Sequence, residues 1–234
     1  MATFVLVPGA WLSGAVWDQT RNQLVAAGHE VVAVTLPGLG DEATAPAAEI
    51  GLETHVSHVV DLLEARELRD VVLVGPSYGG AVVTGVGMRA APRVRRLVYL
   101  AGAVLPAGMS MFDLMGPGAA AGLTAAAVAA GDPDRLPVPG RAELDMFYGE
   151  HGLTGELFER FRDHAVPHPI ETFREPLAAG PFPGDSVPRT YLHSEADGPI
   201  QIPSDAPGWV TQILPTGHWP MLTIPVETAV ALGG

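Results

Sequence analysis

Residues 71–80 of this 234-residue chain, V-V-L-V-G-P-S-Y-G-G, are the strongest indication of its fold. Its first four residues are a continuous apolar run, which is typical of a strand buried on both faces of a parallel sheet. The next residues contain the pattern G-x-S-x-G, and small residues from Gly79 to Ala91 then predict a helix that ends at Pro92. A strand, a sharp turn and a helix in this order form the setting in which G-x-S-x-G exposes a reactive serine.

The turn makes specific demands on its residues. Ser77 must adopt a strained backbone with positive φ, and Gly75 and Gly79 must lack a Cβ that would collide with the turn. The serine oxygen then points into the space above the sheet. The following helix begins there, so its N-terminal dipole stabilises negative charge. These features predict Ser77 as a nucleophile.

Short strands and helices alternate along most of the chain. Beyond the central run, strands are predicted at Phe4–Val7, Glu30–Thr35, Arg96–Leu100, Thr190–His193 and Val210–Leu214. Helices are predicted at Val16–Ala27, at 52–66, near Pro203 and after Pro225, with Ser13 capping the first and Gly28 ending it. This alternation predicts an α/β fold with a mostly parallel, doubly wound sheet, whose site lies at the carboxyl ends of its strands.

Residues 103–186 interrupt the alternation. They combine loops rich in Gly, Pro and Ala with helical stretches at Arg141–Tyr148 and Thr154–His164. We expect 1–102 and 187–234 to form the core and 103–186 to form a helical cap inserted above the sheet.

A general base and its supporting acid are expected after the later strands, in the chain order serine, acid, histidine. His218 lies in the loop after the last predicted strand, where it can accept the proton of Ser77. Asp197 follows the strand Thr190–His193 and is the predicted acid, with Glu195 as the alternative.

The other histidines fit the role of base less well. His55 and His58 are expected on the polar side of a helix, and His168 lies in the predicted cap. His55 and His58 are three residues apart, but no third ligand is near in sequence, so a metal site is not expected.

Acyl transfer also needs donors for a developing oxyanion. The backbone N–H groups of Ala10, in the loop after the first strand, and Tyr78, directly after the nucleophile, are the predicted donors. The side chains of Trp11, Tyr78 and Trp219 are candidates to line the pocket.

Composition narrows the classes of partner. The formal net charge of −13 argues against nucleic acid, which needs clustered Lys and Arg. No cysteine is present, which excludes thiolate catalysis, and no apolar run is long enough to span a membrane or to act as a signal peptide. We expect a cytoplasmic protein and keep a homodimer as an open hypothesis.

Several motifs together resemble a known family. V-L-V-P-G-A-W (5–11), L-P-G-L-G (36–40), G-P-S-Y-G-G (75–80) and G-H-W (217–219) are similar to the small plant-type esterase and hydroxynitrile lyase group of α/β hydrolases and its bacterial relatives. Phe147-Tyr148 also resembles a motif in the cap of that group. The resemblance implies an α/β-hydrolase fold with a helical cap, a triad of Ser77, Asp197 and His218, oxyanion donors at Ala10 and Tyr78, and no cofactor.

Three positions depart from that family. Pro76 replaces a histidine before the nucleophile, Leu12-Ser13 replaces His-Gly after the oxyanion loop, and Trp219 replaces the lysine that lyase members carry after the base. Cyanohydrin cleavage is therefore not expected.

The predicted cap contains many flexible apolar residues, which suit varied substrate shapes. We predict substrate contacts from Trp11, Leu12, Met111, Phe112, Met115 and Trp219. The expected substrate is a small to medium hydrophobic ester, thioester or lactone, cleaved through an acyl-enzyme. Two alternatives stay open: a cyclase or C–C lyase of secondary metabolism that uses the same site, and a ligand-binding protein without catalysis.

Overall fold

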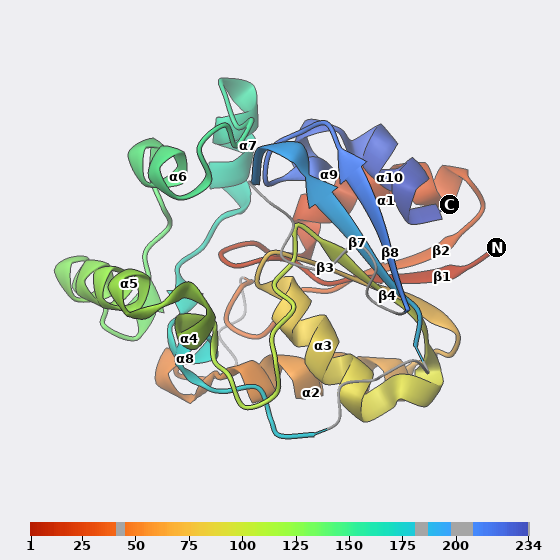
Figure 1. Ribbon diagram of the computed structural model, residues 1–234, viewed down its shortest axis with the longest axis horizontal. Helices are drawn as coiled ribbons and strands as arrows, with labels where there is room; N and C mark the ends of the chain where they lie inside the picture. The colour runs from red at the N-terminus through yellow and green to blue at the C-terminus, as the bar shows by residue number, and fades with distance from the viewer. Residues whose placement is uncertain (41–44, 181–186, 198–207, 234) are drawn as a thin grey trace.

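The computed structural model describes residues 1–40, 45–180, 187–197 and 208–233, and it contains a six-stranded sheet (Figure 1). The strands lie in the order β2-β1-β3-β4-β7-β8, and every neighbouring pair is parallel. Their bounds are β1 Thr3–Leu6, β2 Glu30–Ala33, β3 Val71–Pro76, β4 Val94–Leu100, β7 Arg189–Ser194 and β8 Trp209–Leu214. The predicted parallel sheet is confirmed, and all six predicted strands are present.

The run Val71–Val74 lies at the centre of the sheet, as its composition predicts. β3 pairs with β1 on one side and β4 on the other, and all of its residues are buried. The chain changes direction across the sheet at β1, because β2 lies on one side of it and β3 on the other. Such a switch point leaves a crevice at the carboxyl ends of the strands, where α/β proteins bind ligands.

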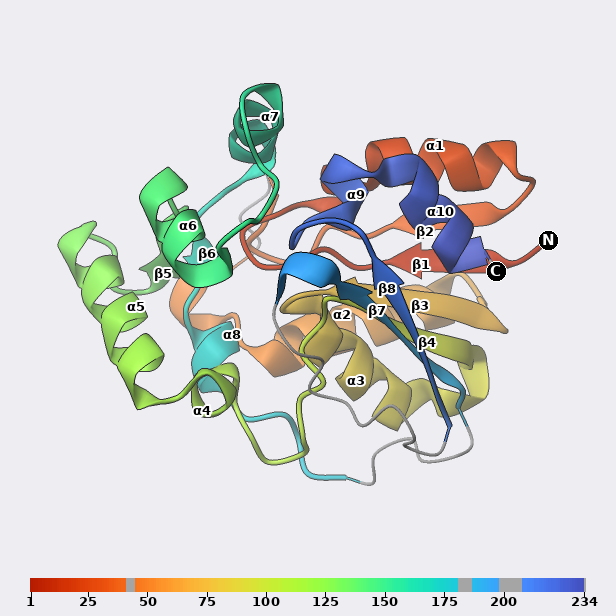
Figure 2. The ribbon, with the colours of Figure 1, turned by 45° about the horizontal axis from the view of Figure 1, so that its top comes forward.

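Helices cover both faces of the sheet (Figure 2). On one face lie α1 Asp18–Ala26, α9 Pro220–Thr223 and α10 Pro225–Gly233, and on the other lie α2 Leu52–Ala65 and α3 Gly79–Ala90. Alternate side chains of β1 enter the two layers: Phe4 packs in the cluster on the α1 face, whereas Val5 packs in the cluster on the α2 face. This period of two is the reason that a short apolar strand can hold both layers.

The segment between β4 and β7 lies beyond one end of the sheet, on the side away from the two chain termini (Figure 1). It contains α4 Met111–Met115, α5 Pro117–Ala129, β5 Arg135–Leu136, α6 Arg141–Tyr148, α7 Glu156–His164, β6 His168–Pro169 and α8 Glu171–Arg174. β5 and β6 pair antiparallel. The helix predicted at Arg141–Tyr148 is confirmed, and the one predicted from Thr154 begins at Glu156. The division into core and cap at 103–186 stays a prediction.

The predicted helix boundaries near the N-terminus are close to those observed. The Ser13 hydroxyl accepts a hydrogen bond from the Ala15 N–H at 3.4 Å, but it caps a short 3₁₀ turn, Gly14–Trp17, that precedes α1. Gly28 ends the segment with φ of +85°, the left-handed conformation that glycine adopts without strain. The helix predicted near Pro203 lies outside the described residues.

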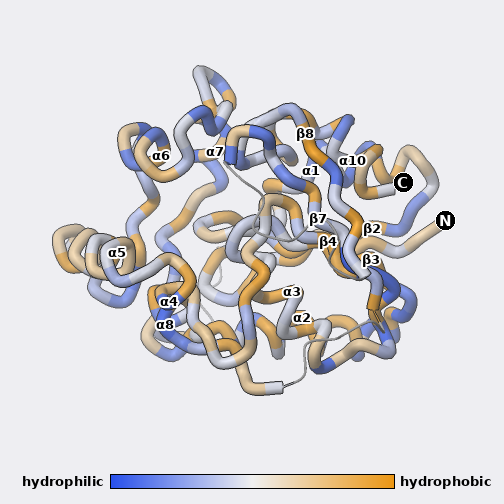
Figure 3. Tube along the Cα trace, viewed as in Figure 1, coloured by the Kyte–Doolittle hydropathy of each residue, from blue (hydrophilic) through white to orange (hydrophobic). Residues whose placement is uncertain are grey.

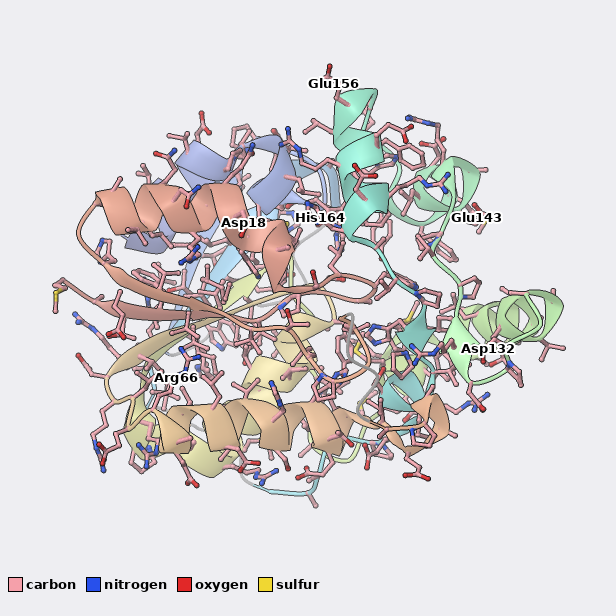
Figure 4. All side chains as sticks on the ribbon, turned by 180° about the vertical axis from the view of Figure 1, so that it is seen from behind. Asp18, Arg66, Asp132, Glu143, Glu156 and His164 are labelled. Carbon is pink, nitrogen blue, oxygen red and sulfur yellow. The ribbon has the colours of Figure 1, made fainter. Side chains whose placement is uncertain are left out.

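Charged groups gather on the outside of the molecule. The carboxylates of Asp132, Glu143 and Glu156 are exposed and lie at the periphery (Figure 4). α5 is mostly pale orange in Figure 3 because it is rich in alanine, and its buried side chains are Leu123 and Ala127. No helix in the described ranges is long and apolar enough to cross a membrane.

Candidate active site

The turn after β3 has the geometry that its sequence demands. Ser77 has φ of +48°, β3 ends at Pro76, and α3 begins at Gly79. A Cβ on Gly75 would lie 2.3 Å from the Gly79 carbonyl oxygen, and one on Gly79 would lie 2.6 Å from the carbonyl oxygen of Pro8. The positive φ and the need for two glycines are therefore confirmed, and the serine is presented at the carboxyl end of the central strand.

His218 and Asp197 lie next to each other in the loops that follow β8 and β7. The imidazole Nδ1 and the Asp197 Oδ2 atom are 3.0 Å apart. A carboxylate only accepts, so Nδ1 donates, and in the neutral imidazole Nε2 then presents a lone pair. Nε2 is buried and has no hydrogen-bond partner among the described residues. Glu195 is exposed, so the geometry favours Asp197 over Glu195 as the group that orients the imidazole.

Tyr148, at the end of α6, covers this imidazole, although no site role was predicted for it. Its ring stacks on the ring of His218 with centroids 4.1 Å apart and an interplanar angle of 28°. Burial, together with the charge of Asp197, raises the pKa of the Tyr148 hydroxyl to about 12, and the Ser77 side chain opposes this shift. Tyr148 thus remains a neutral O–H donor beside the serine. The only sequence signal was the Phe147-Tyr148 pair, which resembles a cap motif.

The predicted oxyanion donors belong to two segments that lie next to Ser77. A Cβ on Gly9 would be 3.5 Å from the Ser77 Cβ, so the loop after β1 packs directly on the nucleophile turn. Within the described part of the chain, the N–H groups of Ala10 and Tyr78 donate no hydrogen bond. Two unpaired amides next to a serine have the composition of an oxyanion hole. That role for Ala10 and Tyr78 stays a prediction.

A pocket of about 660 Å³ opens above Ser77 and includes His218 and Asp197 in its wall. This volume falls within the range of small-molecule sites. Its outer wall is apolar and comes from the segment between β4 and β7; it consists of Met111, Leu114, Met115 and Phe147. Its inner wall includes Tyr191 and His193 of β7.

The other predicted substrate contacts lie elsewhere. Trp11, Leu12 and Trp219 are buried and line a narrow void beside Ser77, not the main pocket. Phe112 does not line the pocket; it packs against Phe173, with ring centroids 5.9 Å apart. Its prediction was wrong because neighbours on a helix point about 100° apart, so the face shared by Met111 and Met115 excludes Phe112.

The predicted positions of the Tyr78 and His55 side chains, in the pocket wall and on a polar helix face, were also wrong. The Tyr78 ring is buried and stacks on Phe173 with centroids 5.4 Å apart. It does not line the pocket. His55, expected on a polar face, is fully buried: its Nδ1 lies 2.9 Å from the Tyr78 hydroxyl, and its Nε2 lies 2.9 Å from the carbonyl oxygen of Pro37. The spacing from Leu52 and Val59 places His55 on the apolar stripe of α2, and that signal could have found it.

Burial of His55 makes stability depend on pH. Desolvation lowers the pKa of His55 to about 4, below its ordinary 6.5. Between these values the unfolded chain binds the proton and the folded chain does not, so stability falls as the pH falls. We expect urea unfolding to show a loss of about 2–3 kcal/mol from this group between pH 7 and about pH 4.5. His55→Gln should lose correspondingly less over the same interval, and an equal loss in both proteins would contradict the assignment.

Among the described residues, no three His, Cys, Asp or Glu side chains form a group that could hold a metal ion. The pocket region brings together a serine in a strained turn, a histidine oriented by a carboxylate, and backbone amides that donate no hydrogen bond among the described residues. A parallel sheet with this serine turn at the end of its central strand defines the class of α/β hydrolases.

The comparisons with known proteins agree with this class. The model of the Alpha/beta hydrolase family matches residues 4–231. The carbendazim hydrolyzing esterase of Nocardioides sp. is 34% identical over 99% of this chain and 98% of its own length. Among solved structures, an extracellular α/β-hydrolase from a Paenibacillus species has a TM-score of 0.78 at 22% identity, covering 100% of this chain and 98% of the other. A methylesterase from Arabidopsis has a TM-score of 0.76 at 19% identity, covering 99% and 97%.

The chain belongs to the α/β hydrolase family, and an esterase is among its relatives over nearly its whole length. With homologues of this kind along nearly its whole length, it is an esterase-type hydrolase. The resemblance drawn from the sequence motifs is confirmed.

Proposed function

We propose that this protein hydrolyses small to medium hydrophobic carboxylic esters through an acyl-enzyme on Ser77. The observation that carries the proposal is the Asp197–His218 pair, whose free Nε2 is buried in the wall of the same pocket as the strained Ser77. A nucleophile, a base and a group that orients the base are the three parts that acyl transfer requires.

The proposed reaction has two steps. Ser77 Oγ attacks the ester carbonyl while His218 Nε2 takes its proton, and the N–H groups of Ala10 and Tyr78 bind the oxyanion. The tetrahedral intermediate collapses, and the alcohol leaves with the proton from His218. Water then attacks the acyl-enzyme with His218 as base, which releases the acid and restores the Ser77 hydroxyl.

Pocket shape supports a small or medium apolar substrate. Thioether and aliphatic side chains at Met111, Leu114 and Met115 form one wall, and such side chains adapt to varied shapes. Relatives are named as a carbendazim hydrolyzing esterase, a pyrethroid hydrolase and a methylesterase, and these names support an ester substrate. Lactones and thioesters present the same carbonyl to Ser77 and belong to the proposed range.

A series of p-nitrophenyl esters tests this function. We expect saturable hydrolysis of the acetate and butyrate, and a kcat/KM for the dodecanoate that is no higher than for these short esters. Release of p-nitrophenolate is followed by absorbance. Rates equal to the uncatalysed background for the whole series would overturn the proposal, and a preference for the dodecanoate would overturn the substrate size.

A further inference from the structure

We propose that His168 is a positioning residue that fixes the oxyanion loop, residues 9–12, from beneath the active site. The inference rests on the proposed function for its catalytic consequence, but its structural part stands alone. His168 is fully buried and does not line the pocket, so it cannot contact a substrate.

The backbone of Trp11 is held on both sides by the segment that precedes α8. The Trp11 N–H donates to His168 Nδ1 at 3.1 Å, and the Trp11 carbonyl oxygen accepts from the Val166 N–H at 2.8 Å. Leu12 forms an isolated bridge with Ala165. Trp11 has φ of +65°, a conformation that a tryptophan keeps only when its surroundings impose it. These contacts supply that constraint next to Ala10.

Hydrogen-bond partners fix the protonation of His168. Its Nδ1 accepts from a backbone amide, so the proton is on Nε2, which donates to the Thr172 hydroxyl at 2.8 Å. The Thr172 hydroxyl in turn donates to the Pro169 carbonyl oxygen at 2.7 Å. Every polar atom in this chain of bonds has one compatible role, and burial keeps the imidazole neutral by lowering its pKa well below the usual value. A neutral His168 is the form that can accept from Trp11.

The buried His168 also contacts Tyr78, the residue whose N–H is the second predicted oxyanion donor. His55 Nε2 donates to the Pro37 carbonyl oxygen, so His55 Nδ1 accepts from the Tyr78 hydroxyl. The Tyr78 ring lies edge-on to the His168 ring, with centroids 4.9 Å apart. His55, Tyr78, His168 and Thr172 thus form one buried histidine cluster beneath both sides of the oxyanion hole. The cluster joins the loop after β1, α2, the nucleophile turn and α8.

Oxyanion donors act only when they lie at hydrogen-bond distance from the position of the developing charge. Loss of the His168 acceptor frees the Trp11 N–H and lets the strained loop relax, which moves the adjacent Ala10 N–H. The cluster contributes to the transition state and not to ground-state binding. We therefore expect an effect on kcat, with little effect on KM.

Two replacements of His168 separate this role from simple packing. His168→Leu removes the acceptor, whereas His168→Asn retains an acceptor oxygen at the position of Nδ1. We expect the leucine variant to lower kcat for p-nitrophenyl acetate at least about 10-fold with KM within about 2-fold, and the asparagine variant to recover most of the loss. His29→Leu is the matched control, because His29 Nδ1 also accepts a backbone N–H, from Ala2 at 3.2 Å, at the amino end of the strands.

Hydrogen exchange tests the constraint on the oxyanion loop without an activity assay. Hydrogen exchange of the peptide that contains Trp11 should quicken in His168→Leu and stay near the wild-type rate in His168→Asn and His29→Leu. Unchanged exchange in a folded leucine variant, or equal loss of kcat in the leucine and asparagine variants, would overturn the role of His168. A wild-type protein that hydrolyses no ester but shows the expected exchange would refute the proposed function and leave the loop constraint standing.

Discussion

Ser77→Ala is expected to lower kcat for p-nitrophenyl acetate by at least about 10³-fold. The alanine removes the hydroxyl of Ser77, which lines the same pocket as His218, and no acyl-enzyme can form without it. Folding should be unaffected, because the φ of +48° that serine adopts is equally strained for alanine. Residual turnover would reflect binding and the oxyanion donors alone.

The Ser77→Ala result is measured as initial rates at saturating ester, with unfolding midpoints to show that the variant is folded. Ser57→Ala serves as control, because Ser57 lies on α2 and bonds to Glu53, away from the pocket. A variant with the wild-type rate would refute the nucleophile. Conversion of a cyclic substrate that survives Ser77→Ala would favour the cyclase or lyase alternative, and tight ligand binding without turnover in the wild type would favour a binding protein.

Asp197→Asn is expected to lower kcat by about 10²-fold or more, with KM nearly unchanged. The carboxylate accepts from His218 Nδ1 at 3.0 Å and leaves Nε2 free to take a proton. An amide in its place can donate to Nδ1, which moves the imidazole proton to Nε2 and removes the base. The orientation of the ring survives, so substrate binding should persist.

Glu195→Gln is the matched control for Asp197, since both side chains follow β7 and only Asp197 contacts His218. Its kcat should stay within about 2-fold of the wild type. The two variants are compared as full pH–rate profiles with the same ester. A large loss of kcat in Glu195→Gln together with a small loss in Asp197→Asn would show that Glu195, and not Asp197, orients His218.

Local sequence patterns predict most of the fold. The run Val71–Val74 predicts a central strand because only a strand buried on both faces is uniformly apolar, and Gly75 and Gly79 predict the turn because their Cβ positions are occupied by backbone atoms. Motif order along the chain then predicted Asp197 and His218, since each follows a strand whose carboxyl end lies at the same edge of the sheet.

The sequence does not predict the site roles of residues that act through tertiary contacts. Tyr148 and His168 come from the segment between β4 and β7, and nothing in their local sequence specifies that one stacks on His218 and the other accepts from Trp11. The prediction for Phe112 was wrong for a different reason. Phe112 is hydrophobic, but on α4 it points about 100° away from Met111, and hydrophobicity alone does not show this helical phase. Composition identifies apolar segments, but only the packed structure decides which side chains reach the pocket.

Labelling of the wild-type protein with a fluorophosphonate, followed by mapping of the modified peptide, tests whether Ser77 is the nucleophile. A serine activated by His218 should react within minutes, and the adduct should lie on Ser77, with His218→Ala abolishing the reaction. Prior incubation with a slowly hydrolysed ester should protect the site. Ester hydrolysis by a protein whose Ser77 remains unmodified would show that Ser77 is not the nucleophile.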